Sequence, residues 1–381
     1  MSFLTHNPPD ARLQQIALAR QTVLHDGKAM TDTGGQSWIE RSWQRALASG
    51  KRPDHAVIFD VISPSAMRRV SDEHHALVRT ARPVLESLGQ AIASTRYFAV
   101  LTDAQGVVID AHGPIDRSDR RADLITRIGT DLSESRLATT AISAALTELQ
   151  PVWLHRGEHF FTANSVYSCA GAPLFGTDGS CIGMLDLTGI EAVERPELKH
   201  LVAQSARSIE NALTLGKLNG QTDLLVRLNW PGRTLGDETD GLVCLNADGY
   251  VTAANQMARM MVPQLTTGNN APRHASDLFG MPHDMLFDAA RKKSGKMALE
   301  VPLWTGLRLH AMPVMHGHSS ASPSAQLEAP AAPAPPLKDI ETALIRQAVD
   351  EARGNVQKAA KTLGISRATV YRRLGSILKR R

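Results

Sequence analysis

The chain has 381 residues, of which 43% are hydrophobic, and a formal net charge of +4, so it can form roughly two to four domains with buried cores. Its three cysteines, Cys169, Cys181 and Cys244, form no paired framework, which excludes a disulfide scaffold and favours a reducing, cytoplasmic setting. The start lacks a basic segment followed by an apolar run, and no stretch approaches the about 18 apolar residues of a membrane span, so we expect neither secretion nor membrane insertion.

The positive charge is concentrated in the last part of the chain. Residues 338–381 hold 11 Lys and Arg against 4 Asp and Glu, whereas the remaining residues together carry a small negative charge. A near-neutral body with a basic tail favours one nucleic-acid-binding module attached to a region that has another task.

Helices are expected in four stretches that have the composition or apolar spacing of helices: parts of residues 1–70, and residues 72–95, 132–149 and 194–220. Pro83 lies inside the second stretch and predicts a kink or a break there. Ser133 stands at the start of the third stretch, where it can serve as the N-cap.

Three other segments share the pattern of a β-hairpin, in which an apolar run, a polar turn with Asp and Gly, and a second apolar run follow one another. They are YFAVLTDAQGVVIDAHG (97–113), GAPLFGTDGSCIGMLDLTG (171–189) and GLVCLNADGYVTAANQMA (241–258). Glycine at the turn supplies the positive φ that a tight hairpin needs. Antiparallel sheets with flanking helices are therefore predicted in two α+β domains, residues 71–218 and, smaller, 233–315.

A composition change marks a boundary at residues 316–337. Ala, Pro and Ser occupy 15 of the 22 positions in HGHSSASPSAQLEAPAAPAPPL. Such a segment has little to bury, so it predicts an extended linker that leaves the following module free to find its target.

The basic tail contains GNVQKAAKTLGISRATVYRRL, residues 354–374, which predicts a helix-turn-helix. Gly364 provides the left-handed turn, and Ala360, four residues earlier, allows the two helices to approach closely. Val370 fills the inner face, and Ser366 stands where the N-cap of the second helix is needed. An all-α DNA-binding domain is therefore predicted over residues 338–381.

The second helix of this domain would lie in the major groove of double-stranded DNA. The residues expected to contact DNA are Ser366, Arg367, Thr369, Tyr371, Arg372 and Arg373. We assign Arg367 and Thr369 to base or groove edges, and Tyr371, Arg372 and the tail Lys379–Arg381 to the backbone. The alternative is a solvated basic helix without a DNA role.

This segment resembles the Fis-type helix-turn-helix that closes many bacterial enhancer-binding regulators. The string N-V-Q-K-A-A-K-T-L-G-I-S-R-A-T-V-Y-R-R-L matches that pattern along its whole length. Proteins of that type bind inverted repeats as dimers, so the resemblance implies a homodimer. Two half-sites about one helical turn apart would also supply the specificity that one small module lacks.

The body of the chain resembles the regulatory region of acetoin-catabolism-type regulators. The residues that carry the resemblance are ERSWQRALASGKRPD (40–54) and the run from Gly129 to Gly189, which is similar to that family's GAF-like domain. Residues 233–315 resemble a degenerate PAS domain more weakly. The resemblance implies a small-molecule effector. Ala46, Leu132 and ATTAIS (138–143) depart from the family pattern, so acetoin itself is not carried over.

The resemblance implies a GAF-like pocket between the sheet and its covering helices, and the segment 153–167 is rich in aromatic residues. Residues from this region and from the strands opposite it are candidates for the pocket lining, although ordinary core packing is the more frequent explanation for each one. The candidates are Phe98, Thr139, Thr140, Trp153, His159, Phe160, Phe161, Tyr167, Cys169 and Met184.

The related regulators contain a central ATPase that acts on sigma-54 polymerase, and its phosphate cradle requires G-x-x-x-x-G-K-[ST]. No such string occurs in the 381 residues. We therefore expect a regulator that acts without ATP hydrolysis, through occupancy of DNA or contact with an RNA polymerase holoenzyme of the sigma-70 type. We expect no enzyme activity, no cofactor and no metal, since HRGEH (155–159) departs from a zinc helix.

Two alternatives remain open. A GAF domain can perform thiol chemistry, so a redox enzyme or redox sensor that uses Cys169 and Cys181 is the rival function. An architectural DNA-binding protein that senses no signal is the third possibility.

Overall fold

The computed structural model describes residues 9–28, 37–59, 62–218, 223–266, 272–291, 298–315 and 356–357. Two units divide the chain, Met1–His318 and Ser319–Arg381. The predicted linker, 316–337, lies outside the described residues, as does the predicted helix-turn-helix apart from Val356 and Gln357, which are helical. The fold below is that of the first unit.

A five-stranded antiparallel sheet forms the first domain. The strands follow the order β2 (Val108–His112), β1 (Tyr97–Asp103), β5 (Cys181–Ile190), β4 (Tyr167–Phe175) and β3 (Val152–His155). The predicted hairpins at 97–113 and 171–189 are confirmed as β1–β2 and β4–β5. Gly106 and Gly179 adopt φ of 85° and 89° in their turns, as tight hairpins require.

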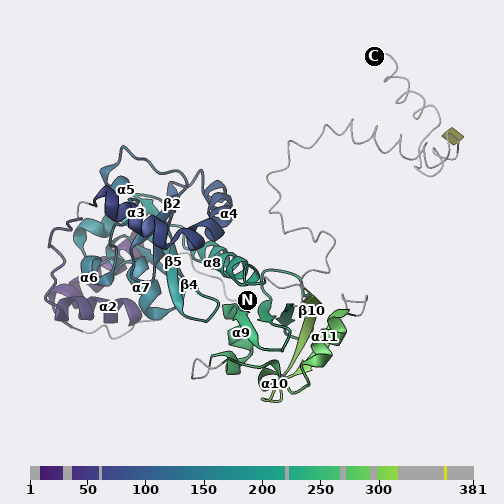
Figure 1. The fold of residues 1–381 in the computed structure, drawn as a ribbon. Helices are drawn as coiled ribbons and strands as arrows, with labels where there is room; N and C mark the ends of the chain where they lie inside the picture. Colours follow the sequence, from purple (N-terminus) through teal and green to yellow (C-terminus); the bar gives the residue numbers. More distant parts are fainter. Residues whose placement is uncertain are drawn as a thin grey trace, which may run out of the picture. The chain divides into compact units, whose positions relative to one another are not determined.

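The two faces of this sheet build separate apolar cores, because successive side chains of a strand point to opposite faces. On one face the strands pack against α4 (His75–Ala91) and α8 (Leu198–Leu215). On the other face they pack against α5 (Arg120–Ile125), α6 (Glu134–Leu137) and α7 (Ala141–Glu148). Figure 1 shows α4 and α8 on one side of β4 and β5, with α6 and α7 on the other.

The N-terminal segment adds a third apolar cluster to the face that carries α7. Its elements are α1 (Pro9–Arg20), a π-helical turn η1 (Gln21–His25), α2 (Ser37–Ala48) and α3 (Pro64–Glu73). Val23, Leu24, Ile39 and Trp43 from this segment pack on Phe160 and Phe161. The segment is therefore part of the first domain's packing.

Two predicted helices differ from the structure. Pro83 lies inside α4 without ending it, and the break falls at His74, between α3 and α4. Pro83 and Arg79 are exposed, so water can bond the carbonyl that the missing N–H leaves free. The stretch 132–149 forms two helices, because Ala138 takes a positive φ and Thr140 caps a new helix.

A second five-stranded antiparallel sheet forms the smaller domain. Its order is β8 (Val251–Ala254), β7 (Gly241–Leu245), β6 (Leu224–Asn229), β10 (Arg308–Met315) and β9 (Leu299–Pro302). The predicted hairpin at 241–258 is confirmed as β7–β8. The sheet begins at β6, upstream of residue 233, where the sequence placed the start of this domain.

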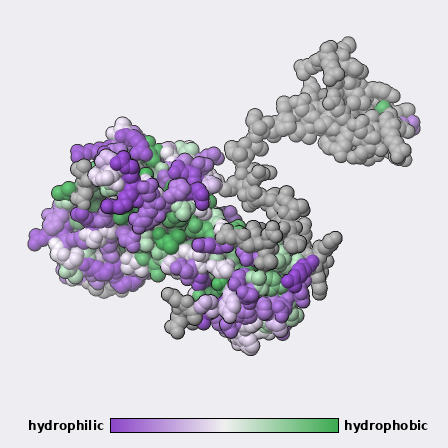
Figure 2. Space-filling view, in the orientation of Figure 1, coloured by the Kyte–Doolittle hydropathy of each residue, from purple (hydrophilic) through white to green (hydrophobic). Residues whose placement is uncertain are grey.

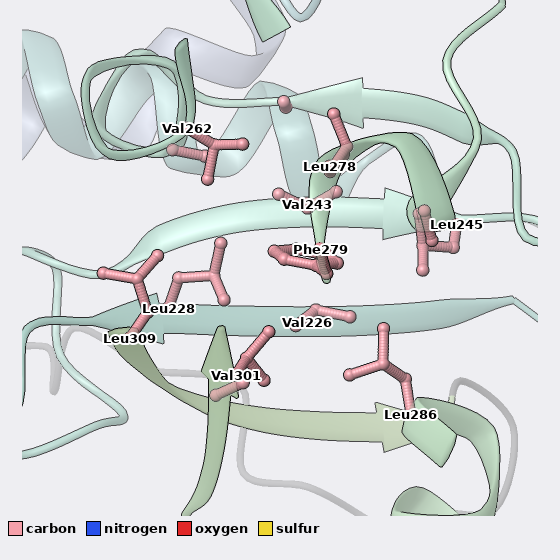
Figure 3. Packing of buried hydrophobic residues seen from close by; sticks show 14 of the residues in the cluster. Val226, Leu228, Val243, Leu245, Val262, Leu278, Phe279, Leu286, Val301 and Leu309 are labelled. Atoms are coloured by element: carbon pink, nitrogen blue, oxygen red, sulfur yellow. The ribbon is translucent and has the colours of Figure 1, made fainter. Parts of the chain in front are cut away.

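Short helices complete the second domain: α9 (Gln256–Met261), η4 (Pro263–Leu265), α10 (Ala275–Leu278) and α11 (Asp284–Arg291). Figure 3 shows the core they share with the sheet, in which Val226 and Val243 of neighbouring strands lie beside Phe279. The described residues thus form two α+β domains, each with its own core.

Hydrophilic residues cover most of the visible face of the described residues, and hydrophobic ones gather near β4 and β5 (Figure 2). Within the part of the chain that the structure describes, no helix combines the length and the apolar character that crossing a bilayer requires.

Candidate functional site

A cavity lies in the first domain, on the face of the sheet covered by α6 and α7, and together with the solvent-open space at its mouth it has about 430 Å³ free of atoms. Its walls are mostly apolar, with a few polar side chains among them. The lining residues are Phe59, Val100, Ile125, Leu132, Leu137, Thr140, Ala141, Ile142, His159, Asn164, Tyr167, Cys169, Asp186 and Thr188. A mostly apolar cavity with a few polar groups is the usual form of a small-molecule site.

Asp186 is the charged residue on the sheet side of this cavity. Its side chain is fully buried, the Thr188 hydroxyl donates to Oδ2, and Oδ1 has no hydrogen-bond partner. Burial raises the pKa of Asp186 to about 7, and the bond from Thr188 opposes the rise. Thr188 also lies 3.4 Å from Cys169 Sγ, so a polar row crosses from β5 to β4.

His159 contributes a second polar group. Its Nδ1 lies 3.0 Å from the carbonyl oxygen of Arg156, and because that oxygen only accepts, Nδ1 carries the proton. Burial lowers the pKa of His159 to about 4, so the ring is neutral at physiological pH and its Nε2 is an acceptor. The ring stands edge-on to Tyr167, with 6.4 Å between centroids.

The N-terminal segment holds the loop that carries His159. Arg20 donates from Nη1 to the carbonyl oxygens of Gly157 and His159, at 2.7 and 2.5 Å, and from Nη2 to that of Phe160 at 3.0 Å. Trp43 Nε1 donates to the carbonyl oxygen of Glu158 at 3.0 Å. HRGEH is therefore the docking site of the N-terminal segment.

His155, at the other end of HRGEH, lies 2.8 Å from the Ser168 hydroxyl through Nδ1. Glu158 pairs with Arg12 at 3.0 Å. Within the described residues no group of three or more His, Cys, Asp or Glu side chains is arranged to hold a metal ion.

Four of the predicted lining residues line the cavity, namely Thr140, His159, Tyr167 and Cys169. Thr140 has a structural task as well, since its hydroxyl accepts from Ser143 N at 3.1 Å and caps α7. The sequence also singled out Leu132 and residues 138–143 as departures near the pocket, and Leu132, Ala141 and Ile142 lie in the wall.

The other predicted lining residues lie elsewhere. Phe98 and Met184 are on the cavity face of the sheet but are packed into its apolar core. Thr139 points to Ser42, with 2.7 Å between the hydroxyls. Trp153 belongs to the opposite face of the sheet, and Phe160 and Phe161 pack on the N-terminal segment.

The sequence analysis did not select Asp186, Thr188 or Phe59. A signal for the first two was present, because MLDLTG places a carboxylate and a hydroxyl two residues apart, on one face of an otherwise apolar strand. Phe59 gave no such signal, since it lies in an irregular segment whose position depends on the tertiary fold.

Cys169 and Cys181 do lie on neighbouring strands, as predicted, but at distant positions. Cys169 pairs with Thr188, whereas Cys181 pairs with Phe175, six residues further along β4. At about 3.3 Å per residue, about 20 Å of strand separates the two thiols. Burial raises the pKa of both, which disfavours the reactive thiolate.

The predicted DNA-contacting residues lie outside the described residues. They are Ser366, Arg367, Thr369, Tyr371, Arg372 and Arg373.

Two segments of the chain match known protein families. Residues 12–211 match the family described as MimR, N-terminal domain. The chain belongs to this family. Residues 336–375 match the family described as bacterial regulatory protein, Fis family, which confirms the predicted Fis-type helix-turn-helix.

The proteins that the chain resembles include transcription regulators. The chain is 29% identical over 272 residues to the acetoin catabolism regulatory protein of Cupriavidus necator, covering 69% of this chain and 39% of that protein. It is 28% identical over 210 residues to the propane 2-monooxygenase operon transcriptional activator MimR of Mycolicibacterium smegmatis, covering 54% of this chain and 34% of that protein. The chain thus spans less than half the length of these relatives.

Among solved structures, the E. coli DhaR(N)–DhaL complex aligns with 73% of this chain and 99% of its own, at 15% identity and a TM-score of 0.45.

Proposed function

We propose that the protein is a ligand-responsive transcription regulator, in which a small molecule in the cavity of the first domain controls DNA binding by the Fis-type segment. The observation that carries this proposal is the combination of a mostly apolar cavity with buried polar groups, in residues 12–211, and a Fis-family match at 336–375. Its relatives are regulators of operons, which supports the same conclusion.

The finer features of the proposal rest on the sequence and on its resemblance to known regulators. In this proposal the 381 residues act without ATP hydrolysis, because they contain no G-x-x-x-x-G-K-[ST] cradle. It binds double-stranded DNA as a homodimer in the cytoplasm, and it acts through occupancy or through a sigma-70-type RNA polymerase holoenzyme. The second domain, PAS-like in this proposal, connects the cavity to the DNA-binding segment. No catalytic step is assigned.

The test begins with selection of genomic fragments that the full chain binds. Occupancy of a selected fragment is then measured by fluorescence anisotropy with and without a panel of small metabolites. The matched control is Ala141→Leu, which fills the cavity from its wall and leaves residues 336–375 unchanged. We expect at least one metabolite to change the occupancy with the parent chain and not with this variant. DNA binding that no metabolite changes would leave an architectural protein as the better description.

The redox alternative receives no support from the geometry of the thiols. A triple variant with Ser at Cys169, Cys181 and Cys244 should keep DNA binding, because none of the three is needed for it in the proposed function. Loss of all function in that variant would favour thiol chemistry.

A further inference from the structure

We infer that the cavity binds a small amine in its ammonium form, and that Asp186 receives the ammonium group. The inference rests on the proposed sensor function, and names the ligand class of the same site.

The first argument is the missing partner of Asp186. Oδ1 has no hydrogen-bond partner although the side chain is fully buried. Its neighbours across the sheet are Val100 on β1 and Gly171 on β4, and neither side chain can donate a hydrogen bond. A buried acceptor without a donor lowers the stability of the protein. A ligand with N–H groups can donate the hydrogen bond that Oδ1 lacks, and this bond favours binding.

The second argument is charge. Two other buried carboxylates of this domain have arginine partners: Glu158 pairs with Arg12, and Asp110 with Arg82 at 3.1 Å. The pKa of Asp186 is raised by burial and lowered by the hydrogen bond from the Thr188 hydroxyl, and no cation among the described residues contributes to it. A buried carboxylate without a counter-charge is unfavourable, and a cationic ligand supplies that charge.

The third argument is the remainder of the wall. His159 is neutral and offers Nε2 as an acceptor, so the wall has a second acceptor in addition to Asp186 Oδ1. Phe59 and Tyr167 add aromatic rings, which attract cations at their faces. Val100, Leu132 and their apolar neighbours suit a short alkyl body. An alcohol would satisfy one acceptor without balancing the charge, and a carboxylic acid would repel Asp186.

The experiment is isothermal titration calorimetry on the full chain with three probes that share one carbon skeleton: isobutylamine, isobutyl alcohol and isobutyric acid. We expect the amine to bind most tightly. Because the ammonium group needs ionised Asp186, its affinity should fall about tenfold from pH 8 to pH 6. The other titratable groups facing Asp186 stay neutral in this range, since the pKa of His159 is about 4 and those of Cys169 and Tyr167 are raised by burial.

Asp186→Asn keeps the shape of the side chain and removes its charge, so amine affinity should fall at least tenfold and lose its dependence on pH. Ala141→Leu should weaken all three probes without changing their order. The inference is overturned if the alcohol or the acid binds as tightly as the amine, if the parent chain does not bind the amine at millimolar concentration, or if affinity does not change between pH 6 and pH 8. None of these outcomes needs a variant.

DNA occupancy separates this inference from the proposed function. If the alcohol binds most tightly and changes DNA occupancy, the proposed regulatory function is supported and the amine is the wrong ligand class. If the amine binds most tightly and leaves DNA occupancy unchanged, the ligand class is supported and the proposed regulatory function is wrong.

Discussion

Ala138 holds a backbone conformation that costs free energy for any residue with a Cβ atom. Its φ is 53° and its ψ −134°, between the end of α6 and the N-cap of α7. Glycine reaches this region without the clash of a Cβ. We predict that Ala138→Gly raises the free energy of unfolding by about 1 kcal/mol, as measured by urea denaturation.

Ala144→Gly is the matched control. Ala144 lies inside α7, where glycine costs backbone entropy, so this change should lower stability by about 1 kcal/mol. If both substitutions destabilise the protein, the conformation at Ala138 is not strained.

Arg367 is assigned to a base edge in the major groove, where arginine makes two hydrogen bonds to guanine. Arg367→Ala should therefore abolish sequence-specific binding while the circular dichroism spectrum stays unchanged. Lys379→Ala is the comparison, because loss of a phosphate contact weakens binding to all sequences alike. A footprint that keeps its sequence preference in the Arg367 variant would contradict the assignment.

Single residues also show how far a sequence predicts a site. The alternation of side chains along a strand correctly places Phe98 and Met184 on the face of the sheet that carries the cavity. It does not tell whether a side chain reaches the cavity, and both residues are packed in the apolar core. Thr139 and Thr140 are adjacent in the sequence, but Thr139 contacts Ser42 whereas Thr140 lines the cavity. Asp186 could have been selected, because an apolar strand rarely carries a carboxylate without a task.

One side chain of the N-terminal segment joins α1 to the loop that carries His159. Arg20 bonds three carbonyl oxygens of the loop at 157–160, and its guanidinium is partly buried. We predict that Arg20→Ala lowers the free energy of unfolding by about 3 kcal/mol, since it removes charged hydrogen bonds and leaves buried acceptors. Differential scanning calorimetry measures the change.

Arg41→Ala controls for the loss of an arginine on the same segment. Arg41 is exposed and pairs with Glu148 at 3.2 Å, so its removal should cost less than about 1 kcal/mol. Equal effects of the two substitutions would show that Arg20 has no special role in docking the segment.

The hairpins were predictable because their cause is local. Gly106, Gly179 and Gly249 take φ between 82° and 89°, and apolar runs on both sides fix the strands. Helix ends were less predictable. Pro83 is accommodated inside α4 because it lies at an exposed position of the helix. The break at Ala138 occurs where this residue packs on the N-terminal segment. β6 was missed although one of its partners, β7, follows it closely in the chain; its other partner, β10, lies about 80 residues away.

At the scale of the whole molecule, the separation of a basic tail from a near-neutral body sets the response of DNA binding to salt. For a dimer we predict that log K falls with log salt with a slope on the order of −5 to −9, because each phosphate contact releases a counterion. Titrations between about 50 and 200 mM salt check this. A nearly flat dependence would contradict binding through the basic segment.

The burial of the cavity wall has a consequence for timing. Every lining residue of the described chain is buried except Phe59, which is half-buried. A ligand wider than the mouth of the cavity can enter only while part of the wall is displaced, and the observed association rate of such a ligand should level off as its concentration rises. At saturating concentrations, the speed at which transcription follows a change in supply would then be set by the rate at which the protein itself opens.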